Sequence, residues 1–146
     1  MKKIFILFLF ITACGYQPLY INKSSNSFSK IEIIGDKRIA REILNFASLK
    51  ENSNSTNKSV IVLNVSENTI ATSRDSKGKV TSYKTYITAI VEIKNNEKII
   101  KNKKFEESFS YNNLDNKYDL FNYRKDIQRN LAREIAEDLI IFINLQ

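Results

Sequence analysis

Hydrophobic and polar residues alternate with a period of two in four segments of the chain, which predicts four β-strands. In the third segment, Ile87, Ala89, Val91 and Ile93 share one face with Tyr83, while mostly polar residues occupy the other. Turn-forming residues follow the first three segments, at Gly35, Gly78 and Asn95. The expected strands cover residues 30–34, residues 60–65 with a weaker continuation to 72, residues 80–94 and residues 98–111, the last with Phe105, Phe109 and Tyr111 on one face.

Apolar residues recur three and four positions apart in two other segments, which predicts two amphipathic helices. The first covers residues 37–49, with Asp36 as a candidate N-cap. The second runs from residue 120 to the C-terminus. Its apolar stripe contains Leu120, Ile127, Leu131, Ile135, Leu139 and Phe142. Its opposite, polar face is expected to contain Arg124, Lys125, Gln128, Arg129, Arg133 and Glu137.

The elements follow in the order β-α-β-β-β-α. A sheet with one apolar face and two helices with one apolar stripe each can bury these surfaces against one another. We therefore expect an α+β fold: a two-layer sandwich in which two helices cover one face of a four-stranded, mostly antiparallel sheet.

The N-terminus has the pattern of a signal peptide. Lys2 and Lys3 precede eight uninterrupted apolar residues, 4–11. As a helix this stretch spans about 12 Å, whereas the hydrocarbon core of a bilayer measures about 30 Å. A permanent transmembrane span is therefore not expected.

Cys14, the only cysteine, follows Ile11-Thr12-Ala13, and this sequence resembles the bacterial lipobox. The resemblance implies that a diacylglyceryl group alkylates the thiol and that cleavage occurs before Cys14. The alternative is an ordinary secretory signal with a chance cysteine. We expect residues 1–13 to be removed, residues 14–29 to form a lipidated N-terminus and tether, and residues 30–146 to form a single domain.

Composition narrows the possible functions. The chain has no histidine, which is the commonest general base and the commonest metal ligand. If Cys14 is acylated, no free thiol remains either. There is no glycine-rich phosphate loop, nucleophile elbow or zinc-ligand spacing. Glu106 and Glu107 are adjacent, but neighbouring strand residues point to opposite faces. We expect a protein that is not an enzyme and that needs neither cofactor nor metal.

The charge of the chain favours anionic partners. The whole sequence carries a formal charge of +7, and loss of residues 1–13 leaves 21 Lys and Arg against 16 Asp and Glu. An exported, lipidated protein is not normally exposed to nucleic acid. Anionic lipid headgroups or phosphorylated glycolipids are therefore the better candidates.

Two groups of cations are candidates for binding an anionic partner. Arg74, Lys77 and Lys79 lie at the expected hairpin tip, with Lys84 further along the strand, and could clamp a phosphate; a solvated turn is the alternative. Lys101, Lys103 and Lys104 lie in the last strand, where they would either blunt a sheet edge or form a binding patch.

Four motifs resemble the LPS-assembly lipoproteins of the LptE family. They are Ala13-Cys14-Gly15-Tyr16-Gln17-Pro18-Leu19-Tyr20, Gly78-Lys79-Val80-Thr81-Ser82-Tyr83 before a long strand, Ser108-Phe109-Ser110-Tyr111, and Ala136-Glu137-Asp138-Leu139 in the last helix. Their order and spacing extend over essentially the whole mature chain.

The resemblance implies a lipid-anchored outer-membrane lipoprotein that plugs the LptD β-barrel, assists its assembly and helps to deliver lipopolysaccharide. It also implies that lipopolysaccharide is bound by basic residues near the hairpin and on the last helix, here Arg74 or Lys77 and Arg129. Gly15 replaces the Asp that is associated with inner-membrane retention.

A second hypothesis is a periplasmic lipoprotein adaptor of a transporter or of a peptidoglycan-synthesis complex, because one fold serves several functions. Co-purification of an outer-membrane barrel or of an inner-membrane complex separates the two hypotheses.

Overall fold

The structure is a computed structural model that describes residues 27–53 and 58–145. The expected signal peptide and the lipidation site at Cys14 lie outside these residues. Within them the chain forms six strands and two helices: β1 (Ser27–Phe28), β2 (Lys30–Gly35), α2 (Lys37–Phe46), β3 (Lys50–Glu51), β4 (Ser59–Arg74), β5 (Val80–Asn95), β6 (Lys98–Asn112) and α3 (Lys117–Asn144).

The main sheet has four strands in the order β2-β4-β5-β6. β2 runs parallel to β4, and the other two pairs are antiparallel, so the predicted mostly antiparallel sheet is confirmed. β4 extends to Arg74, somewhat beyond the predicted end at residue 72. The register shifts after Ala71 and again after Ser73, close to the hairpin tip.

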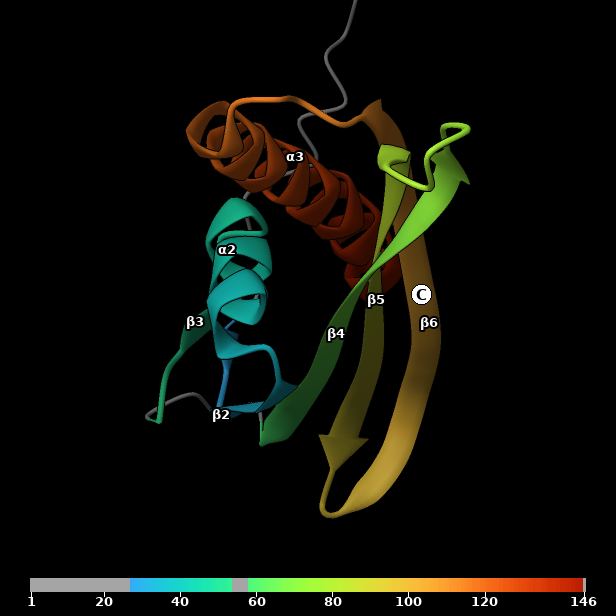
Figure 1. The fold of residues 1–146 in the computed structure, drawn as a ribbon. Coiled ribbons are helices and arrows are strands. Elements are labelled where there is room, and N and C mark those ends of the chain that lie inside the picture. Colours follow the sequence, from blue (N-terminus) through green and yellow to red (C-terminus); the bar gives the residue numbers. More distant parts are fainter. Residues whose placement is uncertain (1–26, 54–57, 146) are drawn as a thin grey trace, which may run out of the picture.

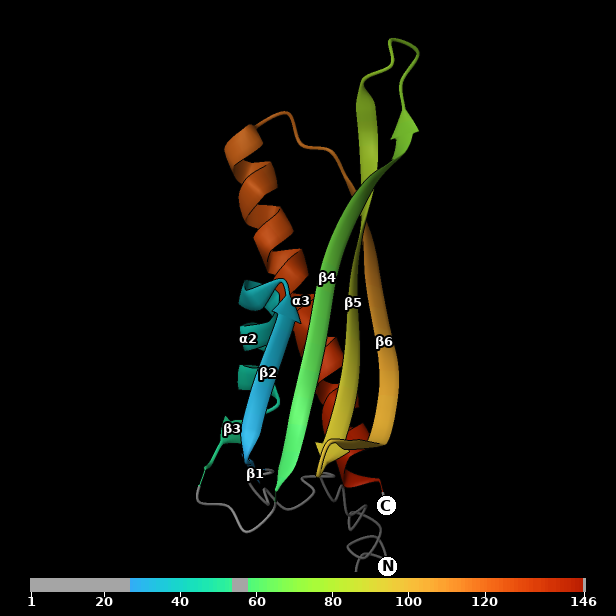
Figure 2. The same ribbon diagram turned by 90° about the horizontal axis from the view of Figure 1, so that it is seen from below.

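Both helices pack on the same face of this sheet, which confirms the predicted two-layer arrangement (Figures 1 and 2). The core between the layers contains the apolar residues that were predicted from the third strand and from the last helix. Its fully buried side chains include Ile39, Ile43, Ile61, Leu63, Ile87, Ile135 and Leu139. Within the described ranges, no helix is both long and apolar enough to cross a membrane.

The entry into α2 is fixed by two adjacent residues. Asp36 caps the helix as predicted: its side chain accepts hydrogen bonds from the backbone N–H groups of Arg38 and Ile39, at 2.9 and 3.0 Å. Gly35 has a positive φ of 81°, and a Cβ there would lie 2.1 Å from the carbonyl oxygen of Val65. Glycine is therefore required by both conformation and space.

α2 ends at Phe46, three residues before the predicted end at Leu49. Ser48 adopts a positive φ of 55°, and the N–H groups of Ser48 and Leu49 bond back to the carbonyls of Asn45 and Leu44. This is a Schellman-type termination. Ala47 and Leu49 are buried, so the apolar pattern predicts their burial but not the end of the helix.

A small two-stranded sheet was not predicted. β1 pairs in parallel with β3, and Phe28 in β1 is only 5% exposed within the core. The sequence pattern assigned Phe28 to the tether, whereas in the structure the packed domain already includes it.

Candidate functional site

The hairpin between β4 and β5 projects beyond the helix layer (Figure 2). We call residues 74–80 the hairpin tip. Asp75 organises it, because its carboxylate accepts from the N–H groups of Lys77 and Lys79 at 2.9 and 2.8 Å. Gly78 supplies a positive φ of 81° in open space. The turn is therefore held by its own hydrogen bonds.

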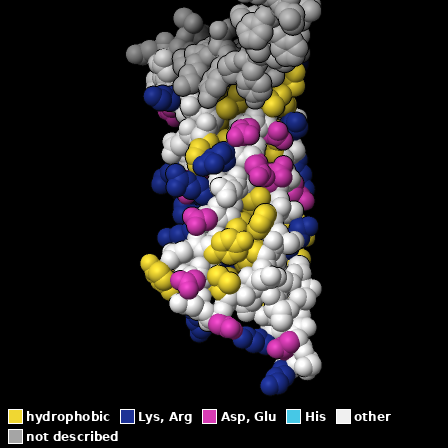
Figure 3. Space-filling view, turned by 90° about the horizontal axis from the view of Figure 1, so that it is seen from above, with side chains coloured by type: hydrophobic (Ala, Val, Ile, Leu, Met, Phe, Trp, Pro, Cys, Tyr) yellow, Lys and Arg dark blue, Asp and Glu magenta, His cyan; other side chains and the backbone are white. Residues whose placement is uncertain are grey.

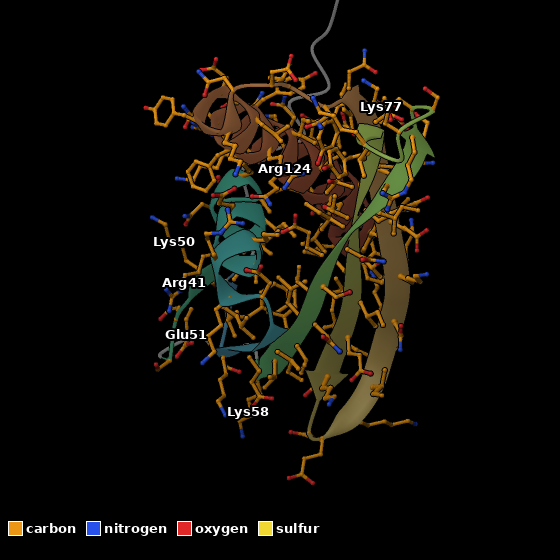
Figure 4. The ribbon with its side chains drawn as sticks, in the orientation of Figure 1. Arg41, Lys50, Glu51, Lys58, Lys77 and Arg124 are labelled. Carbon is orange, nitrogen blue, oxygen red and sulfur yellow. The ribbon has the colours of Figure 1, made fainter. Side chains whose placement is uncertain are left out.

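The three predicted cations of the tip lie in different surroundings. Arg74 donates to the carbonyl of Gly78 at 2.9 Å, and Lys79 forms an ion pair with Asp115 at 2.8 Å. This hydrogen bond raises the pKa of Lys79 and lowers the pKa of Asp115. The side chain of Lys77 is exposed at the tip (Figure 4). All three residues are exposed at this end of the molecule.

The linker before α3 ties the tip to that helix. The backbone N–H of Asn113 donates to the carbonyl of Thr81 at 2.8 Å, and its side-chain amide donates to the carbonyl of Val80 at 2.8 Å. With the Lys79–Asp115 pair, these bonds fasten the start of β5 to the segment that leads into α3.

The other two predicted site residues lie elsewhere. Lys84 is on the sheet face opposite the helices, 5.0 Å from the ring of Tyr86. Arg129 lies 5.9 Å from the ring of Phe46, so it faces α2. The structure thus groups Arg74, Lys77 and Lys79 but does not bring Lys84 or Arg129 to the hairpin tip.

An aromatic cluster lies between α3 and the half of the sheet that is nearer the hairpin tip. It contains Tyr83, Tyr111 and Tyr123 with Arg124. The rings of Tyr83 and Tyr111 stack at 5.7 Å, and Tyr123 meets Tyr111 edge-on at 5.8 Å. The Arg124 guanidinium lies 4.6 Å from the centre of the Tyr83 ring. Such cation–π contacts contribute about 0.5–2 kcal/mol.

Arg124 corrects the predicted polar face of the last helix. It points toward the sheet (Figure 4), and its Nε is buried without a hydrogen-bond partner among the described residues. A signal for this was present in the sequence, because Arg124 stands four residues after Leu120 and three before Ile127, directly on the apolar stripe.

Gln128 is the second correction to that face. Its amide donates to Glu67 of β4 at 2.6 Å, and its carbonyl accepts from Arg38 of α2 at 2.7 Å. Gln128 therefore connects both helices with the sheet rather than facing solvent.

Other aromatic side chains on β6 and α3 are exposed. Phe109 at the end of β6 is 46% exposed, and Tyr118 and Phe121 in the first turns of α3 are 70% and 54% exposed. Lys125 lies 4.5 Å from the ring of Phe121. Figure 3 shows hydrophobic side chains gathered among charged ones on the α3 side of the molecule. This surface offers both apolar contacts and cations.

The adjacent carboxylates Glu106 and Glu107 do not converge on one site. Glu106 and Glu107 point to opposite faces, as predicted: Glu106 pairs with Lys104 at 2.6 Å on the open face, while Glu107 faces α3. In the described part of the chain, no group of three or more acidic, histidine or cysteine side chains could hold a metal ion.

The α+β fold is that of several solved bacterial lipoproteins. The chain is similar to rare lipoprotein B from Shewanella oneidensis, with a TM-score of 0.56 at 14% identity over 74% of this chain and 88% of that one. It is also similar to a minor lipoprotein from Acinetobacter baumannii, with a TM-score of 0.58 at 14% identity over 82% and 92%. A putative lipoprotein from Caulobacter crescentus matches with a TM-score of 0.55 at 18% identity over 76% and 85%.

At these identities the likeness establishes the fold. No protein-family model matches the sequence, and no curated protein matches it.

Proposed function

We propose that this protein is an outer-membrane lipoprotein of the LptE type, which plugs and helps to assemble the LptD β-barrel and assists the delivery of lipopolysaccharide. It acts as a binding and assembly partner and not as an enzyme. Cys14 anchors it by its lipid, and the folded domain sits in the barrel lumen.

The observation that carries this proposal is the shared fold with proteins described as lipoproteins. The match covers 85% to 92% of the length of three such proteins, so it involves nearly their entire domains. The lipobox at Ile11-Thr12-Ala13-Cys14 supports the same class independently, because it comes from the sequence and not from the fold.

The surface around the hairpin tip is the observation that favours lipopolysaccharide as the ligand. Lipopolysaccharide combines phosphate groups with acyl chains, and here the cations of the hairpin tip lie on the same half of the molecule as exposed aromatic side chains. The face of the sheet opposite the helices is rich in Ser, Thr and Asn side chains, which suits the hydrated lumen of a barrel.

Co-purification tests the partner. The intact lipidated chain is isolated from bacterial membranes in mild detergent, and the proteins bound to it are identified. A large outer-membrane β-barrel in stoichiometric amount is the expected result. An inner-membrane transporter or a peptidoglycan-synthesis complex in its place would favour the adaptor hypothesis and contradict the proposal.

Charge reversal tests the ligand. The combined change Arg74→Glu, Lys77→Glu and Lys79→Glu should weaken lipopolysaccharide binding at least about tenfold at physiological salt, because three glutamates at the tip would repel its phosphate groups. Binding unchanged by this variant would refute the role of the tip.

The matched control reverses the same number of charges at another exposed site. Arg41, Lys50 and Lys58 lie on α2, in β3 and just before β4, away from the hairpin tip (Figure 4). Replacing all three with Glu gives the same net charge and should leave binding nearly unchanged. Equal losses in both variants would show a general charge effect.

A further inference from the structure

Strand β6 forms one edge of the four-stranded sheet. It is hydrogen-bonded to β5 on one side, and no strand pairs with its other side in the described residues. Its 15 residues offer a long row of backbone donors and acceptors. A free edge of this length can accept a further strand.

The charges along this edge are arranged with opposite signs about Phe105. Lys103 and Lys104 precede it, and Glu106 and Glu107 follow it. If two copies of β6 pair antiparallel with Phe105 opposite Phe105, Lys104 faces the second copy's Glu106 and Lys103 faces the second copy's Glu107. Each of the four cross-strand pairs then joins opposite charges, which favours this register.

The two lysines and two glutamates fall on matching faces. Lys104 and Glu106 stand on the open face of the sheet, opposite Ile90 and Thr88. Lys103 and Glu107 stand on the face that packs against α3, opposite Val91 and Ile87. Antiparallel pairing preserves these faces, so both sets of charges meet their counterparts.

Among residues 27–53 and 58–145, no Lys or Arg forms an ion pair with Glu107. It is partly buried, and its acidic neighbours are Glu134 and Asp138 of α3; burial, followed by these carboxylates, raises its pKa. The Nζ of Lys103 lies over two aromatic rings, 4.8 Å from the centre of Phe105 and 5.9 Å from that of Phe142, and no carboxylate of the described residues forms an ion pair with it. A second copy would supply each of them with an opposite charge.

We propose that β6 is a self-association edge, on which a second copy of this chain pairs antiparallel about Phe105 to form one continuous eight-stranded sheet. The lysines then have a role other than blunting the edge, because a purely cationic edge would repel a second copy. The proposal concerns the free lipoprotein, so it can fail without affecting co-purification of the barrel.

Disulfide cross-linking in membranes tests the register. In this pairing Asn102 faces the second copy's Ser108, and both side chains are exposed. We expect the full-length, lipidated variant Asn102→Cys with Ser108→Cys to form a reducible dimer, since paired strand residues lie about 4.5–5.5 Å apart. Within one chain these positions are about 20 Å apart along the strand, which excludes an internal bond.

Three controls make the result specific. Each single variant should give no dimer, because like positions would lie about 20 Å apart across the interface. The pair Asn102→Cys with Ser110→Cys is two residues out of register and should also give none. Absence of a dimer from the matched pair, or equal yields from the controls, would overturn the proposal.

Charge exchange then tests whether the cross-strand charge pairs cause the association, in variants that also carry the cysteine pair. Lys103→Glu with Lys104→Glu, and separately Glu106→Lys with Glu107→Lys, should each lower the dimer yield at least about tenfold. Combining all four changes restores the opposite signs and should restore the dimer. Failure of this rescue, in a variant whose circular dichroism is native, would contradict the charge-pairing argument.

Discussion

Gly35 and Gly78 form a matched pair of positions for a stability test. Both have a φ of 81°, a conformation that L-residues rarely adopt, but their surroundings differ. A Cβ at Gly35 would lie 2.1 Å from the carbonyl oxygen of Val65, whereas a Cβ at Gly78 would meet nothing within 4 Å. Replacing each glycine with alanine therefore separates backbone strain from steric exclusion.

The expected losses follow from these contacts. Both Gly35→Ala and Gly78→Ala place an L-residue in the left-handed region, at about 1–2 kcal/mol. At Gly35 the distance from a Cβ to the carbonyl oxygen of Val65 must also increase from 2.1 Å to at least 3.4 Å to reach an ordinary contact, so the β2–β4 pair must open. This breaks the 2.8 Å hydrogen bond from Asp36 N–H to Val65 O and loosens the N-cap of α2, adding about 2 kcal/mol in total.

Urea unfolding measures the difference. The measurement uses the mature chain with Cys14→Ser, which cannot be acylated at this position. Since the chain has no tryptophan, unfolding is followed by far-UV circular dichroism and tyrosine fluorescence. Gly35→Ala should lower the free energy of unfolding by about 3–4 kcal/mol and Gly78→Ala by about 1–2, with unchanged m-values. Losses within about 0.5 kcal/mol of one another would refute the steric argument.

Three further predictions concern single side chains. Arg124→Met should change the free energy of unfolding by less than about 1 kcal/mol, because the lost cation–π contact is offset by removal of the unpaired buried Nε; a large stability loss would contradict this. The raised pKa of Glu107, caused by burial and then by Glu134 and Asp138, means that the folded state holds its proton more tightly than the unfolded chain. Stability must then fall as pH rises above the ordinary pKa of a glutamate side chain, 4.5. Glu107→Gln should therefore raise the urea midpoint at pH 7 but not at pH 4, as measured on dilute protein. Asp36→Ala should cost about 1 kcal/mol and Asp36→Asn much less, and equal losses would show that the cap is unimportant.

Elements with strong periodicity could be predicted from the sequence. The alternation over β5 gave its buried face, and the four-residue spacing of Ile127, Leu131 and Ile135 gave the stripe of α3. These patterns work because each reflects burial on one side of one regular element. The cap at Asp36 was equally accessible, because it depends on local geometry alone.

Features that depend on distant partners could not be predicted in this way. The parallel pairing of β1 with β3 involves two residues from each strand, which is too short for a periodic signal. The charge of Arg124 predicts exposure to solvent, whereas its position lies on the apolar stripe, and in the structure the position decides. Arg129 and the hairpin tip are separated by about 50 residues, and only the packing of α3 against α2 shows that Arg129 turns away from the tip.

The hydrogen bonds from Asn113 to Thr81 and Val80 have a consequence for molecular motion. An isolated two-stranded ribbon would fluctuate independently of the domain, but these bonds couple the β4–β5 hairpin to the segment that leads into α3. The hairpin tip and the start of α3 are therefore held together by hydrogen bonds and by the Lys79–Asp115 ion pair. A ligand that contacts both pays the entropy of ordering one element instead of two, which favours large amphipathic molecules that reach across them.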